Sequence, residues 1–96
     1  MTLLEKLSKP YFVKTEEVKT PAIMAAIEVM KRPEFTYSNV GGALYRAGTT
    51  WDNHERAADR LLQRARKMDL VRSAKGMGKW ETIPEAWDNL ANEEEV

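Results

Sequence analysis

The sequence predicts a small α+β domain, mainly helical, in which three core helices precede a β-hairpin and a short final helix. Two observations predict this class. Apolar residues repeat at helical spacing in three stretches between residues 20 and 68. After residue 69 the pattern changes to two β-compatible runs joined by a link that contains two glycines, which is typical of a hairpin. The 96 residues suit one such domain with one modest core.

The chain divides into three parts in this interpretation. Residues 1–19 form an N-terminal extension, residues 20–90 form the domain, and residues 91–96 form an acidic tail. Within the extension, a short helix ends before Pro10, because proline stops a helix. An extended segment at residues 11–13 then packs on the body of the domain.

The first core helix is expected over residues 21–32. Thr20 is a suitable N-cap, and Pro21 occupies the first helical position, where its missing N–H is not needed. Pro33 ends the helix and disfavours helical geometry in the residue before it. A very short strand or extended link follows at residues 35–37.

The second core helix is expected over residues 39–47. Ser38 is its predicted N-cap. Gly41 and Gly42 weaken the helix interior, and adjacent glycines usually permit another backbone to come close. Gly48 closes the helix as the residue after its C-cap.

The third core helix is expected over residues 50–68, with Thr50 as N-cap, and it is the most periodic part of the chain. Two faces separate on a helical wheel. The apolar face contains Trp51, His54, Ala58, Leu61, Leu62, Ala65 and Met68. A second stripe contains Asn53, Arg56, Arg60, Arg64 and Lys67. One face is therefore suited to a core and the other to an anionic partner.

The hairpin is expected over residues 70–83, and its link runs from Lys75 to Gly78. Pro84 opens a last short helix, residues 85–90, with Trp87 as an apolar contact.

This order of elements resembles the winged helix-turn-helix family. The resemblance covers about residues 20–90 and is one of spacing and residue types. It is carried by Ser38-Asn39-Val40-Gly41-Gly42-Ala43-Leu44 (second helix), Gly48-Thr49-Thr50 (tight turn), Trp51 to Met68 (recognition helix), Asp69-Leu70-Val71-Arg72 (entry to the wing), Gly76-Met77-Gly78-Lys79-Trp80 (wing tip and return strand) and Ile83-Pro84-Glu85-Ala86 (exit). The resemblance implies a winged helix and a double-stranded DNA partner.

The charge distribution fits that partner better than the formal net charge of zero suggests. Residues 46–80 carry nine basic and four acidic side chains, whereas residues 81–96 carry six acidic side chains and no basic one. A basic segment followed by an acidic tail matters more for association than the total does.

The resemblance places the third helix in the major groove with its N-terminal residues nearest the base edges. Thr50, Asn53 and Arg56 are then expected to contact bases, because asparagine pairs well with adenine and arginine with guanine. Phosphate contacts are expected farther along the helix, at the start of the second helix and in the hairpin. The complete set of DNA-binding candidates is Ser38, Thr49, Thr50, Asn53, Arg56, Arg60, Arg64, Lys67, Lys75 and Lys79, with Tyr37 as a weaker addition.

The leading hypothesis is a small, sequence-selective transcriptional regulator, of the size seen in phage and bacteria. The alternative is a winged-helix protein-interaction module, such as a phage-like inhibitor or an assembly adaptor, because a fold does not decide a function. A DNA reader needs Arg56 and Arg60 exposed and unpaired, whereas an adaptor should tie them up in ion pairs. Tight DNA binding would require a homodimer, formed through residues 1–19 or the final helix.

Other function classes receive no support from the sequence. There is no cysteine for disulfides or thiolate metal sites, and His54 is the only histidine, so no metal or cofactor is expected. The link at residues 76–79 lacks the residues of a phosphate-binding loop, and no catalytic motif is present, so we expect no enzyme. The tryptophans are expected to pack. No apolar run is long enough to span a bilayer and no secretory signal is evident, which predicts a cytoplasmic protein without a membrane partner.

Overall fold

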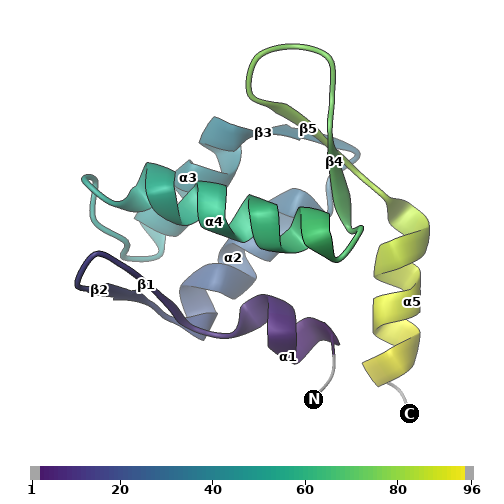
Figure 1. Cartoon of the computed structure of the whole chain (residues 1–96), viewed down its shortest axis with the longest axis horizontal. Helices are drawn as coiled ribbons and strands as arrows, with labels where there is room; N and C mark the ends of the chain where they lie inside the picture. The colour runs from purple at the N-terminus through teal and green to yellow at the C-terminus, as the bar shows by residue number, and fades with distance from the viewer. Residues whose placement is uncertain (1–2, 95–96) are drawn as a thin grey trace.

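Five helices and two small antiparallel sheets are formed by residues 3–94, the part of the chain that the computed structural model describes (Figure 1). The α+β class predicted from the sequence is therefore confirmed. The helices are α1 (Leu3–Ser8), α2 (Thr20–Met30), α3 (Tyr37–Arg46), α4 (His54–Lys67) and α5 (Pro84–Glu94). The strands are β1 (Tyr11–Val13), β2 (Glu16–Val18), β3 (Glu34–Thr36), β4 (Val71–Ser73) and β5 (Lys79–Thr82).

Helices α2, α3 and α4 pack against one another around the core. Their fully buried side chains include Ile23, Ile27, Met30, Val40, Leu44, Leu61 and Leu62. Where α3 meets α4, a Cβ added to Gly41 would lie 3.3 Å from Cδ2 of His54, so this glycine permits the close approach that the sequence predicts. Gly42 has only the guanidinium end of Arg46 nearby.

The three-stranded sheet has the order β3-β5-β4, and both strand pairs are antiparallel. Trp80 of β5 lies opposite Phe35 on one side and Ser73 on the other, and its half-buried indole packs against the core. The loop between β4 and β5 is fastened to the start of α3, because the backbone N–H of Tyr37 donates to the carbonyl of Gly78 at 2.7 Å. The predicted hairpin is confirmed.

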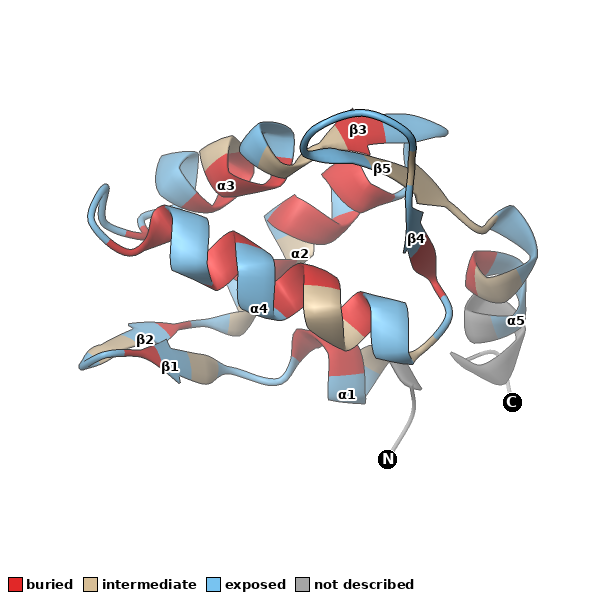
Figure 2. Ribbon diagram, turned by 45° about the horizontal axis from the view of Figure 1, so that its top comes forward, coloured by how far each residue is buried: buried red, intermediate tan, exposed pale blue. Residues whose placement is uncertain are grey.

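The N-terminal segment belongs to the core. Leu7, Val13 and Val18 are at most 1% exposed, and the hydroxyl of Tyr11 donates to the carbonyl of Ala57 in α4 at 2.6 Å. The predicted short helix and the packed extended segment at residues 11–13 are confirmed. Strand β2, which pairs with β1, was not predicted. Figure 2 shows buried positions in both strands of this hairpin, which runs beside the helices.

Two helix starts differ from the sequence prediction. Thr20 is the first residue of α2 and Lys19 its N-cap, because the Thr20 hydroxyl donates to the carbonyl of Ser8 at 2.9 Å. Helix α3 begins at Tyr37. Thr36 caps it through reciprocal bonds with Asn39, which satisfy two backbone N–H groups at once, so Ser38 is not the cap.

Helix α4 begins at His54, and the prediction that it begins after Thr50 is wrong. The backbone N–H groups of Asn53 and His54 both donate to the carbonyl of Thr50, which closes a turn over residues 51–53. The helical wheel therefore does not extend back to Trp51. This side chain is 67% exposed, and its expected place on the core face is wrong.

Helix α5 continues to Glu94, beyond the predicted end at residue 90, and so includes most of the expected tail. Trp87 is buried and packs with the core, as predicted. The last two residues of the tail, 95 and 96, lie outside the described residues, as do the side chains of residues 90–94. Within the described part, no helix has the length and apolar character needed to cross a membrane.

Candidate nucleic-acid interface

Helix α4 lies between two hairpins. In Figures 1 and 2 the β4–β5 hairpin rises above α4, and the β1–β2 hairpin runs below it. Helix α4 carries the basic stripe predicted from the sequence. The DNA-binding candidates lie on this helix, on the turn before it, on α3 and on the β4–β5 hairpin.

Five candidates are exposed and make no hydrogen bond or ion pair through their side chains with any described residue. They are Ser38 on α3, Arg56 and Lys67 on α4, and Lys75 and Lys79 on the β4–β5 hairpin. An uncompensated cation on a surface can bind an anionic partner without first breaking an internal contact. These four cations and one hydroxyl are therefore the available part of the predicted site.

Tyr37 fixes the β4–β5 loop relative to α4. Its backbone N–H holds Gly78, and its hydroxyl donates to the carbonyl of Glu55 in the first turn of α4. Burial raises the pKa of the Tyr37 phenol, and the nearby Asp59 and Glu55 carboxylates raise it further. The phenol consequently remains a neutral donor at physiological pH, and the loop and helix keep one relative position.

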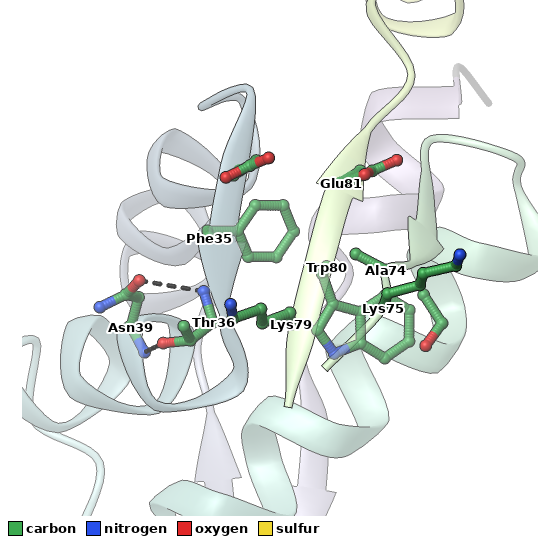
Figure 3. Close-up of a pocket in the computed structure, with 10 residues that line it drawn as sticks. Phe35, Thr36, Asn39, Ala74, Lys75, Lys79, Trp80 and Glu81 are labelled. Atoms are coloured by element: carbon green, nitrogen blue, oxygen red, sulfur yellow. Dashed lines mark hydrogen bonds between the residues drawn. The ribbon is translucent and has the colours of Figure 1, made fainter. Parts of the chain in front are cut away.

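A hollow of about 660 Å³ lies between the β4–β5 loop and the start of α3 (Figure 3). Phe35 and Trp80 contribute apolar surface, Lys75 and Lys79 contribute positive charge, and Glu34 and Glu81 contribute negative charge. The two lysines therefore border a concave surface that carries both signs of charge.

Arg64 is held by the N-terminal segment. Its Nη1 donates to the carbonyls of Lys6, Leu7 and Lys9 at 3.4, 2.9 and 2.7 Å, and its guanidinium lies 4.9 Å from the centre of the Tyr11 ring. Arg64 thus satisfies carbonyls at the end of α1 that have no helical partner. The Nη1 donors of Arg64 are therefore occupied inside the protein and are not available to a phosphate in this structure.

Two further candidates are engaged inside the protein. Arg60 donates through Nη1 to the carbonyl of Phe12 in β1. Thr49 is buried at 5% exposure, and its backbone N–H donates to the carbonyl of Leu44. Both residues connect parts of the fold in this structure.

Thr50 and Asn53 share one internal partner, the carboxylate of Glu16 in β2. The backbone N–H of Thr50 donates to Oε2 at 3.0 Å, and its hydroxyl donates to Oε1 at 2.7 Å. Nδ2 of Asn53 donates to Oε1 at 2.9 Å. These hydrogen bonds, that from Asn53 first, lower the pKa of Glu16. No local feature of the sequence predicts this contact, because Thr50 and Asn53 lie 34 and 37 positions after Glu16.

The exposed surface of α4 carries both signs of charge. Asp52 precedes the helix, Glu55 and Asp59 lie on it, and all three are exposed. The internal ion pairs expected under the adaptor hypothesis are not made by Arg56 with any described residue, whereas Arg60 binds a backbone carbonyl instead of a carboxylate. Arg56 therefore meets the criterion set for a DNA reader, whereas Arg60 meets neither criterion, because it is engaged but not in an ion pair.

An aromatic cluster at the corner between α3 and α4 was missed by the sequence analysis. The Trp51 ring lies 5.3 Å from that of Tyr45 and 4.6 Å from that of His54, measured between centroids. His54 is buried, as predicted, but Tyr45 and Trp51 are 47% and 67% exposed. The described residues contain no group of three His, Cys, Asp or Glu side chains placed to hold a metal ion.

Comparisons of this chain with protein-family models, with curated proteins and with solved structures give no match.

Proposed function

We propose that this chain is a winged-helix protein that binds double-stranded DNA and acts as a small transcriptional regulator. Helix α4 enters the major groove, and the β4–β5 hairpin serves as the wing. The observation that carries the proposal is a set of exposed cations on α4 and the β4–β5 hairpin that make no side-chain hydrogen bond or ion pair with a described residue, namely Arg56, Lys67, Lys75 and Lys79. Neutralisation of backbone phosphates by such side chains supplies most of the affinity of a non-specific DNA complex.

The order of the elements supports this proposal. Helix α2, strand β3, helices α3 and α4, and strands β4 and β5 follow the sequence of the winged helix that the chain resembles, with the strand order β3-β5-β4. Tyr37 holds the loop against the beginning of α4, so loop and helix are presented together. A preorganised surface loses less entropy when it binds.

The proposed base contacts are fewer than those expected from the sequence. Thr50 and Asn53 are engaged by Glu16, which leaves Arg56 as the available base reader. Its guanidinium has the geometry to donate to O6 and N7 of guanine together. Lys67 and the loop lysines contact phosphates, and the sequence preference then centres on one guanine.

Fluorescence anisotropy against a random DNA duplex at low and moderate salt tests the proposal. We expect the affinity to fall steeply as the salt concentration rises. The slope of log affinity against log salt concentration should become shallower by about 0.9 for each phosphate contact removed. The variant Arg56→Ala/Lys67→Ala should bind more weakly. The control Lys31→Ala/Arg32→Ala removes the same charge at the end of α2, where Lys31 faces Trp87, and should bind almost as wild type does.

A protein-interaction module is the second candidate, and the exposed Tyr45–Trp51 pair favours it. Aromatic side chains are enriched in the cores of protein interfaces, and exposed aromatic clusters often mark them. A second copy of the chain is the simplest partner. Sedimentation velocity over a range of concentrations should then show self-association that Trp51→Ala removes. A monomer at all concentrations contradicts the homodimer.

A further inference from the structure

Three donors at the beginning of α4 converge on one carboxylate. The N–H and hydroxyl of Thr50 and the side-chain amide of Asn53 all donate to Glu16, over distances of 2.7 to 3.0 Å. A carboxylate and a phosphodiester are both oxyanions that accept several hydrogen bonds through adjacent oxygens. The three donors therefore form a small anion-binding site, and the carboxylate of Glu16, a group of the same chain, occupies it.

Asn53 is oriented toward this anion at a cost. The residue is only 9% exposed, and its Oδ1 is buried without a hydrogen-bond partner among the described residues while Nδ2 donates to Glu16. An unsatisfied buried acceptor destabilises the folded state. The amide is thus held in the orientation that presents a donor to an oxyanion, although its own oxygen gains nothing.

The Glu16 side chain can leave this position while the hairpin stays in place. Val13 and Val18 are 1% exposed and keep β1 and β2 in the core, so detachment of the whole hairpin would expose them. Glu16 itself is only partly buried, and Thr50 is exposed. Rotation of the Glu16 side chain would therefore release the three donors without moving either strand.

We propose that Glu16 occupies the position of a DNA backbone phosphate at the beginning of α4 and restrains DNA binding until the phosphate displaces it. The inference rests on the proposed DNA-binding function and adds a regulatory contact to it. Thr50 and Asn53, expected from the sequence to contact bases, become phosphate donors that are exchanged between the carboxylate and the DNA.

The test compares Glu16→Gln with Glu17→Gln by anisotropy against the same random duplex. Both variants remove one negative charge from β2, but Glu17 is exposed and makes no side-chain hydrogen bond or ion pair with a described residue. We expect Glu16→Gln to bind about three- to tenfold more tightly than Glu17→Gln, with an equal log–log salt slope, because the neutral donors of Thr50 and Asn53 hold a phosphate without releasing a further counterion. Thr50→Ala in the Glu16→Gln background should remove most of this gain.

The outcomes separate this inference from the proposed function. If the wild type binds DNA and the two variants have equal affinities, Glu16 is only structural and the inference is overturned, while the function stands. If the wild type and both variants fail to bind at low salt, the function and the inference are both overturned. Thermal unfolding of each variant confirms that the compared proteins are folded.

Discussion

Arg64 in α4 donates a hydrogen bond of 2.9 Å to the carbonyl oxygen of Leu7, which lies 57 positions earlier in the chain. The same guanidinium reaches two neighbouring carbonyls and stacks over Tyr11. A residue that pattern and resemblance assign to DNA therefore fastens α1 to α4. Arg64 therefore differs from Arg56 in the same basic stripe, whose side chain makes no hydrogen bond or ion pair with a described residue.

Arg64→Ala is expected to destabilise the fold without weakening DNA binding as much as Lys67→Ala does. Loss of hydrogen bonds from a charged donor, together with the contact to Tyr11, should lower the free energy of unfolding by about 1–3 kcal/mol. Arg64→Lys should recover only part of this, because one ammonium does not reproduce the planar fork of guanidinium donors. Urea unfolding measures both variants. A stability equal to wild type in Arg64→Ala would contradict the structural role.

The two adjacent glycines of α3 should respond differently to alanine. At Gly42 the added Cβ meets only the flexible end of Arg46 at 3.4 Å, so the higher helix propensity of alanine should stabilise the protein by about 1 kcal/mol. At Gly41 the Cβ lies 3.3 Å from Cδ2 of His54 and 3.8 Å from Cβ of Ala58. The His54 ring is held by its contact with the Trp51 carbonyl, so it cannot easily move away.

Overpacking costs about 1–3 kcal/mol, which exceeds the gain in helix propensity, and Gly41→Ala should be less stable than wild type. Thermal unfolding of the two variants under identical conditions makes the comparison. Equal stabilisation by both substitutions would show that α3 and α4 approach less closely here than the structure has it.

Tyr11 should make the protein sensitive to alkaline pH. Burial raises the pKa of this phenol from 10.0 to about 12, despite the opposing charges of Arg64 and Arg60. The folded state therefore retains a proton that the unfolded state releases. The stability from this group is complete below pH 10 and is lost as pH rises through about 12.

Spectroscopic titration of phenolate absorbance should show a tyrosine step near pH 12, and Tyr11→Phe should remove that step. The same substitution should reduce the loss of stability between pH 10 and about pH 12. Phenylalanine has no hydrogen bond to the Ala57 carbonyl that ionisation could break. An unchanged titration curve in Tyr11→Phe would assign the late step to another tyrosine.

Arg56 and Lys67 should differ in how they affect DNA recognition. Arg56→Ala should reduce the preference for a guanine-containing site by about 1–3 kcal/mol, because it removes a bidentate contact to a base edge. Lys67→Ala should weaken binding to all duplexes alike and reduce the salt slope by about 1. Competition titrations with duplexes selected from a random pool distinguish the two patterns. Uniform weakening by both variants would mean that Arg56 contacts a phosphate.

The helices and the β4–β5 hairpin could be predicted because their signals are local. The spacing of Leu61, Leu62 and Ala65 predicts the buried face of α4, and these residues are indeed fully buried. The helical wheel misplaced Trp51 because the same period was extended across a turn. The hydrogen bonds to the Thr50 carbonyl, which close that turn and interrupt the helical period, are visible only in the structure.

The candidate site was less predictable, since the contacts that alter it join distant segments. Arg60 and Arg64 bind backbone carbonyls, which every residue possesses and which therefore leave no signature in a sequence. The residues around Glu16 in the sequence give no indication that its carboxylate binds Thr50 and Asn53 in the turn before α4. Charge pattern alone could not separate the free Arg56 from the engaged arginines beside it.

Mapping of backbone amide resonances during titration with a short DNA duplex tests the proposed function most directly. We predict shifts that depend on DNA concentration at the exposed positions of α4, from Arg56 to Lys67, and at residues 74–79 of the β4–β5 hairpin, with α5 unaffected. These shifts should fade as salt is raised. An absence of shifts at low salt, or shifts confined to α5, would contradict the account.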